Sequence, residues 1–125
     1  MIKLQDTRKE TGNQGEDRAS EYLIEKGYEV LFRNYRTKTG EIDIISLIDE
    51  TIAFVEVKTL PNGTPELLSH VLDSRKQKRI IKTAKRFLSN YRQYNNKYIR
   101  FDVIVLDMPG LPCIYHVENA FSELL

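Results

Sequence analysis

Two apolar segments separated by only two residues constrain the fold of this chain more than any other feature. Residues 40–48 and 51–58 are rich in Ile, Val and Phe, and each is typical of a β-strand. Asp49 and Glu50 lie between them and predict a tight hairpin turn. That turn sets the register, because residues equally distant from it face each other across the hairpin. Apolar side chains then meet apolar side chains along both strands.

The same register places Asp43 opposite Glu56, with Cβ atoms roughly 5 Å apart. Lys58 lies on the same face of its strand as Glu56. A carboxylate at the end of an apolar face needs a partner, because burying an unpaired charge is unfavourable. A divalent metal between Asp43 and Glu56, with Lys58 beside it, would supply that partner. The alternative is a solvated strand end with an ordinary salt bridge.

The length and composition are those of one ordinary globular domain. The 125 residues fit a single domain over 1–125, and they are 41% hydrophobic and 30% charged. No apolar run approaches the roughly 20 residues of a membrane span, and the first residues lack the apolar core of a signal peptide. The sequence therefore predicts a cytoplasmic protein without a membrane partner. The single cysteine excludes an internal disulfide and a multi-cysteine zinc site.

Helical periodicity, capping residues and β-branched runs predict the remaining elements. They are a helix over 7–26, a strand over 28–35, a helix over 74–91, a strand over 100–106, an edge strand over 113–117 and a short closing helix over 119–125. Residues 60–65 hold two prolines and a glycine and predict a loop. The order α-β-β-β-α-β-β predicts an α/β domain with a central mixed β-sheet flanked by helices.

The first predicted helix carries a third acid on its packing face. Gly12, Gly15 and Ala19 lie on one stripe of this helix, and Glu16 falls within that stripe. Two glycines on one face indicate close approach to a neighbouring segment, because glycine costs about 1 kcal/mol against alanine inside a helix. Glu16 either forms a salt bridge or joins the acids of the hairpin.

The second long helix is strongly basic. Eight basic residues and no acidic residue lie between Arg75 and Arg92. A solvated helix face usually mixes charges, so an unopposed run of one sign favours a polyanion such as DNA. The residues expected to contact nucleic acid are Lys76, Arg79, Lys82, Lys85 and Arg86. Lys76 lies near the edge of the apolar stripe, from which it could reach toward the acids or a substrate phosphate.

Several short motifs occur in a fixed order along the chain, namely Gly15-Glu16, Asn34, Gly40-Glu41-Ile42-Asp43, Phe54-Val55-Glu56-Val57-Lys58, Lys76 and Arg100-Phe101-Asp102-Val103. With these motifs the chain resembles the bacterial YraN-like family of uncharacterised proteins from about Gly12 to Phe121. The resemblance implies a restriction-endonuclease-like fold, similar to archaeal Holliday junction resolvases. It also implies a metal site formed by Glu16, Asp43 and Glu56, with Lys58 as the catalytic lysine.

The chemistry of these residues suits phosphodiester hydrolysis. Mg²⁺ or Mn²⁺ would take carboxylate oxygens, and the Val57 carbonyl could complete the inner coordination sphere. Lys58 could orient a metal-bound water or offset charge in the transition state.

Three functions are therefore open. The first is a metal-dependent DNA endonuclease acting on branched or damaged DNA. The second is a nucleic-acid-binding module of the same fold with little or no cleavage activity. The third is a structural or assembly protein whose acids only form salt bridges. The oligomeric state is also open, with a homodimer among the arrangements.

Overall fold

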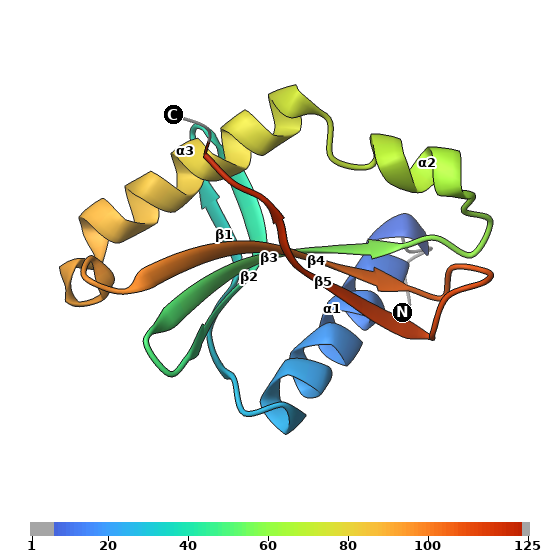
Figure 1. Cartoon of the computed structure of the whole chain (residues 1–125), viewed down its shortest axis with the longest axis horizontal. Helices are drawn as coiled ribbons and strands as arrows, with labels where there is room; N and C mark the ends of the chain where they lie inside the picture. Colours follow the sequence, from blue (N-terminus) through green and yellow to red (C-terminus); the bar gives the residue numbers. More distant parts are fainter. Residues whose placement is uncertain (1–6, 124–125) are drawn as a thin grey trace, which may run out of the picture.

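The computed structural model describes residues 7–123, with side chains described from Gln14 onward, and it consists of one sheet between two long helices (Figure 1). The elements in chain order are α1 (Thr7–Glu25), β1 (Glu29–Thr37), β2 (Gly40–Ile48), β3 (Thr51–Thr59), α2 (Pro65–His70), α3 (Ser74–Asn90), a 3₁₀ turn (Arg92–Tyr94), β4 (Tyr98–Leu106) and β5 (Ile114–Phe121). The strand order in the sheet is β1-β2-β3-β4-β5. Strands β3 and β4 are parallel and the other neighbours are antiparallel, which confirms the predicted central mixed sheet.

The β2–β3 hairpin has the predicted turn and register. Ile48 pairs with Thr51, and the ladder continues with regular pairing as far as Ile44 opposite Val55. Asp49 adopts a left-handed backbone conformation with φ of 51°, which aspartate tolerates in tight turns. Pairing stops beyond Ile44, so the two strands separate at the end where the predicted site residues lie.

The two helices cover opposite faces of the sheet. Ala19 and Leu23 of α1 pack with Ile44 and Val55, whereas Phe87 of α3 packs on the other side. The strand residues that meet α3 include Ile45 and Phe54, which are the immediate neighbours of those that meet α1. This division follows from the alternation of side chains along a strand. Among the described helices, none is both long and apolar enough to cross a membrane.

Helix α2 was not predicted, because its residues follow a segment rich in proline and glycine. The helix begins with local capping: the Thr64 hydroxyl accepts a hydrogen bond from the Leu67 amide, and Pro65 occupies the first turn. No residue of α2 is buried. Local capping therefore accounts for an element without an apolar periodicity.

The predicted closing helix over 119–125 is wrong as far as the described residues reach. Strand β5 continues to Phe121 instead of ending at Val117. Asn119 adopts φ of 54°, and its amide donates a hydrogen bond of 3.0 Å to Asp102 Oδ1 on β4. The buried Asp102 carboxylate therefore accepts the hydrogen bond of the backbone amide at this irregular position, and the strand continues beyond it. Residues 124–125 lie outside the described residues.

We expect Gly15→Val to destabilise the protein by overpacking the contact between α1 and β3. A Cβ atom at Gly15 would lie 2.8 Å from Thr59 Oγ1 and 3.2 Å from Leu106 Cδ1. Overpacking of this kind costs about 1–3 kcal/mol of unfolding free energy. Urea unfolding measures the change, and Gln14→Val on the exposed side of α1 controls for the low helix propensity of valine. Equal losses in both variants would contradict the close approach.

Candidate functional site

A cavity of about 390 Å³ lies where the β2–β3 ladder ends, beneath the first half of α3. Its lining comes from the β1–β2 turn, from the start of β2, from the end of β3 and from α3. Asp43, Glu56, Lys58, Lys76 and Arg79 all line it. The fold thus brings together five predicted site residues from three separate elements.

The Asp43 carboxylate accepts the hydrogen bond that a backbone carbonyl of β2 would accept if the β2–β3 ladder continued. Its Oδ2 atom accepts a hydrogen bond of 2.8 Å from the amide of Val57 on β3. In a strand the N–H and C=O groups of one residue point to the same side, so the Val57 carbonyl also faces the gap beside Asp43. The predicted direct cross-strand pair of Asp43 and Glu56 is replaced by this side-chain contact, because regular pairing ends at Ile44 and Val55.

Glu56 is the most deeply placed acid of the cavity, with 5% of its surface exposed. Burial, together with the nearby Asp43 carboxylate, raises the pKa of Glu56 to about 8. The Lys58 ammonium lies 4.0 Å from Glu56 Oε2, which is too long for a hydrogen bond. Burial likewise raises the pKa of Asp43, although the Val57 amide and Lys58 oppose that shift. Lys58 and Lys76 therefore oppose the rise in the pKa of both acids but do not outweigh burial.

Lys76 enters the cavity from the first turn of α3, as its place at the edge of the apolar stripe suggested. Asp73 caps this helix, and its Oδ1 atom accepts from the Lys76 amide at 2.9 Å. Burial lowers the pKa of the Lys76 amine, and the adjacent Lys58 lowers it again. Lysine amines and carboxyl groups therefore share one partly closed space, because Lys38 and Glu41 also line it beside Lys58, Lys76, Asp43 and Glu56.

Glu16 lies outside the lining of this cavity. The Asn34 side chain donates a hydrogen bond of 2.9 Å to Glu16 Oε1, and Arg33 lies 3.7 Å from the same oxygen. Burial raises the pKa of Glu16, and the charge of Asp43 adds to the shift. Asp43 therefore influences Glu16 electrostatically, while Asn34 and Arg33 supply its contacts. The role of Glu16 as a metal ligand stays a prediction.

The oxygen atoms beside the cavity suit a hard divalent cation. Within the described side chains, no group of three or more His, Cys, Asp or Glu residues is arranged to hold a metal. A cation between Asp43 and Glu56 would therefore take the remaining ligands from the Val57 carbonyl and from water. Mg²⁺ commonly binds in this way, with one or two carboxylates and several waters. The donor set fits, and a cation would also relieve the repulsion between the two acids.

The basic residues of α3 line two neighbouring spaces along the helix. Lys76 lines the cavity that holds Asp43 and Glu56, called the acid cavity below, and Lys82 and Lys85 line a wider groove of about 610 Å³. Arg79 lines both. Arg86 is exposed. Lys85 forms an ion pair with Glu123, so the basic surface is not entirely unopposed, contrary to the expectation from the helix sequence alone.

The β1–β2 turn is a part of the site that the sequence did not indicate. Thr37, Lys38, Thr39 and Gly40 all line the acid cavity. The Thr39 hydroxyl lies 3.0 Å from that of Thr83 on α3. A turn of small and polar residues carries no periodic signal, and a contact between residues 44 positions apart leaves none in a single sequence.

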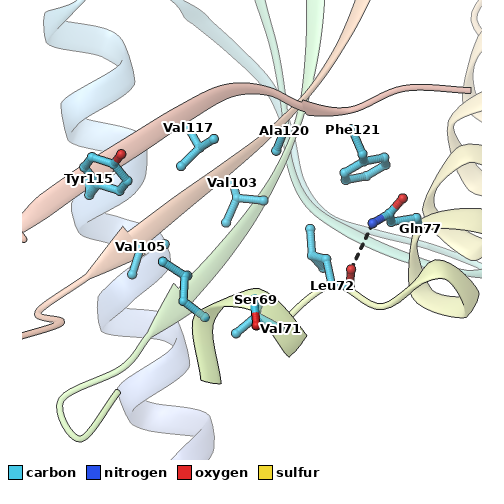
Figure 2. Close-up of a pocket in the computed structure, with 11 residues that line it drawn as sticks. Ser69, Val71, Leu72, Gln77, Val103, Val105, Tyr115, Val117, Ala120 and Phe121 are labelled. Carbon is cyan, nitrogen blue, oxygen red and sulfur yellow. Dashed lines mark hydrogen bonds between the residues drawn. The ribbon is translucent and has the colours of Figure 1, made fainter. Parts of the chain in front are cut away.

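A second cavity, of about 350 Å³, lies between α2 and the sheet and contains no predicted site residue (Figure 2). Its walls are largely apolar, with Leu72 facing Val103 and Val117. Gln77 closes one end by donating a hydrogen bond of 2.9 Å to the Leu72 carbonyl. Of these two cavities, only the one beneath α3 is lined by acids and amines.

A buried polar network lies at the opposite edge of the sheet. Asp102 is fully buried and accepts hydrogen bonds from His116 at 2.7 Å and from Arg100 at 2.8 Å. Burial alone would raise the pKa of Asp102, but His116, Arg100 and the Asn119 amide outweigh burial and lower it. Asp102 therefore holds Arg100 in place, and the network connects β5 to β4.

Comparisons with known proteins agree on one family. The family model described as "Uncharacterised protein family UPF0102" matches residues 15–106. The chain belongs to the UPF0102 family. This membership confirms the resemblance to YraN-like proteins that the motifs indicated.

Similar UPF0102 proteins occur in distant bacteria. A UPF0102 protein of Treponema denticola is 48% identical over 124 residues, which cover 90% of this chain and 95% of the relative. A UPF0102 protein of Treponema pallidum is 46% identical, covering 89% of this chain and 91% of the relative. One from Vibrio parahaemolyticus is 41% identical, covering 94% and 96%. These proteins share nearly their whole length with this chain.

We expect Glu56→Gln to flatten the pH dependence of stability in metal-free buffer. The pKa of Glu56 is about 8 in the folded protein, against an ordinary value of 4.5. Between these values the unfolded chain releases a proton that the folded protein retains, so the unfolding free energy falls as pH rises. Below about pH 4.5 both states are protonated and the effect vanishes.

Urea unfolding with EDTA at several pH values from about 5 to about 8 measures this slope. Glutamine is neutral throughout, so the variant should lose the part of the slope that Glu56 contributes. The exposed Glu25→Gln is the matched control and should keep the wild-type slope. An unchanged slope in Glu56→Gln would show that Glu56 is already ionised in the folded protein.

Proposed function

We propose that this UPF0102 protein is a metal-dependent DNA endonuclease that hydrolyses phosphodiester bonds. The observation that carries the proposal is that the half-buried Asp43 and the buried Glu56 share one cavity with Lys58 and Lys76. A site of like charges with shifted pKa values is unfavourable for folding, and such sites occur preferentially where chemistry requires them. The basic helix α3 begins at this cavity and would bring a polyanionic substrate to it.

Each residue has a separate role in this proposal. Asp43 and Glu56 would hold Mg²⁺ or Mn²⁺, together with the Val57 carbonyl. The bound cation would supply Lewis acidity and a water of lowered pKa. Lys58 lies on the same strand as Glu56 and would orient the attacking water or offset charge on the phosphorus oxygens. Lys76 would bind a non-bridging oxygen of the scissile phosphate.

The remaining cations of α3 would hold the substrate backbone without reading its sequence. Phosphate contacts position nucleic acid, whereas contacts to base edges specify it. Lys82 and Arg86 are exposed on α3, one turn apart. Branched or damaged DNA is the substrate class that the resemblance implies, and Glu16 remains a candidate for a further metal ligand in such a mechanism.

We expect Asp43→Asn, Glu56→Gln and Lys58→Ala each to reduce metal-dependent cleavage by roughly 10²-fold or more. Asparagine at position 43 retains an oxygen that can accept from the Val57 amide, so the fold should persist while the charge is lost. Cleavage of a labelled panel of duplex, flap, single-stranded and four-way DNA with Mg²⁺ or Mn²⁺ is the measurement.

Lys26→Ala, at the far end of α1, is the matched control for lost lysine charge. Full cleavage by Glu56→Gln would contradict the assignment of the acids. If the wild-type protein binds DNA but cleaves none of the panel, it is the binding module instead.

We expect Lys82→Glu to weaken DNA binding similarly for unrelated sequences. It should also reduce the slope of log K against log salt by about one unit, because one phosphate contact is lost. Fluorescence anisotropy over a salt series measures both quantities. Lys26→Glu makes the same charge change on the opposite face of the sheet and should leave affinity and slope nearly unchanged. Equal effects of the two substitutions would place the binding surface away from α3.

A further inference from the structure

The β1–β2 turn is fastened to α3 by a chain of hydroxyl groups. Thr83 is fully buried, and its hydroxyl donates a hydrogen bond of 2.8 Å to the carbonyl of Arg79. A hydroxyl has one proton, so Thr83 must accept from Thr39, whose oxygen lies 3.0 Å away. Thr37, at 2.7 Å, then donates to Thr39. The chain of donors therefore runs in one direction, from the turn into the helix.

Close packing accompanies these hydrogen bonds. Gly40 has φ of 149°, and a Cβ atom there would lie 3.3 Å from Thr83 Oγ1 and 3.7 Å from Arg79 Cβ. The turn thus touches the helix at Arg79 and Thr83, and at this point there is no space for another chain. One side of the acid cavity is closed by this contact.

The acids lie at the base of a small space. The cavity of about 390 Å³ is near the lower end of the range for small-molecule sites, roughly 300–1,000 Å³. Glu56, the acid with 5% of its surface exposed, lines this space. A phosphodiester must therefore enter the cavity to approach both acids. The backbone of an intact duplex is held on the outside of a stiff rod, whereas a single strand can bend inward.

Positive charge borders the cavity on two sides. Lys38 belongs to the β1–β2 turn, and Lys76 and Arg79 belong to α3. Glu41 also lines the cavity, but Arg36 pairs with this acid at 2.8 Å. A strand that enters between them would have cations along both sides of its backbone. Grooves of this kind track single strands with little sequence preference.

We propose that the acid cavity accepts a single-stranded segment of nucleic acid, held between the β1–β2 turn and α3, and excludes intact duplex. The proposal rests on the proposed nuclease function and names the substrate class of the same site. Lys38 is a binding residue in it, and Thr39 and Thr83 are positioning residues that keep the turn against the helix.

Binding in EDTA tests the proposal without cleavage. Fluorescence anisotropy of a labelled oligonucleotide, alone and annealed to its complement, should give an affinity about ten-fold or more tighter for the single strand at equal salt. Lys38→Ala should weaken single-strand binding several-fold, and the control Lys26→Ala should not. Equal affinities for the two forms, or equal effects of the two substitutions, would overturn the proposal.

Variants of the hydroxyl chain test the role of the turn. Thr83→Val keeps the volume of the side chain but removes the hydroxyl, so it should release the turn and bring the affinity ratio toward one. Thr39→Val removes the same contact from the half-buried turn and provides a second test if Thr83→Val does not fold. Thr51→Val, in the distant β2–β3 hairpin, is the control. An unchanged ratio in the folded hydroxyl variants would overturn the role of the turn.

Cleavage separates this inference from the function on which it rests. With Mg²⁺ or Mn²⁺, a flap or gapped substrate should be cut within its single-stranded part and a blunt duplex should not. Cleavage of the duplex at the same rate would overturn the inference and support the nuclease function. Failure to cut any substrate, with single-strand preference retained in EDTA, would overturn the nuclease function and support the inference.

Discussion

The end of the β2–β3 ladder is the constraint on which the site depends. Regular pairing stops at Ile44 and Val55, and beyond this point the two backbones separate. The separation would leave the Val57 amide without a partner, and a buried unpaired amide is costly. The Asp43 carboxylate accepts that hydrogen bond at 2.8 Å. Asp43 therefore has a structural contact as well as a place in the cavity, whereas Glu56 lies beside it at 5% exposure with the Lys58 ammonium 4.0 Å away. The gap between the strands is what allows two acids to face one space.

The regular alternation of side chains between the two faces of the sheet is interrupted once in β1 and once in β2. In a regular strand, residues three apart point to opposite faces. Phe32 and Tyr35 nevertheless both pack in the cluster beneath α3, as do Ile42 and Ile45. Asn34 adopts φ of 54° at the corresponding point of β1, which accounts for the irregularity there. This irregularity carries the Asn34 amide group toward α1, where it binds Glu16, while Asp43 lines the cavity on the α3 side. Glu16 and Asp43 are therefore close enough to interact electrostatically but lie in different surroundings.

Local patterns in the sequence predicted most of the fold, and contacts between distant segments account for what they missed. The Asp49-Glu50 turn and the apolar faces set the hairpin register, and Asp73 marked the start of α3, because both signals lie within a few residues. Grouping of Asp43, Glu56 and Lys58 followed from that register. The contact of Thr39 with Thr83, the ion pair of Lys85 with Glu123 and the extension of β5 each depend on residues at least 17 positions apart. Periodicity and capping carry no information about such pairs, so the turn that closes the cavity was found only in the structure.

Asp102 and Glu56, two buried acids among the described residues, differ in the direction of their pKa shifts, and this difference separates an acid whose charge is satisfied from one whose charge is not. Asp102 is fully buried, yet its pKa is lowered because His116, Arg100 and a backbone amide satisfy its charge. Glu56 is nearly as buried, yet its pKa is raised to about 8. Lys76 shows the complementary shift, because burial and Lys58 lower the pKa of its amine.

Acids and amines that paired closely would each be held in their charged forms. Here both kinds of group are shifted toward neutrality in one cavity, so the lysines do not fully compensate the acids. A cation between the acids and a phosphate near the lysines would satisfy both, which is the combination that phosphodiester hydrolysis brings together.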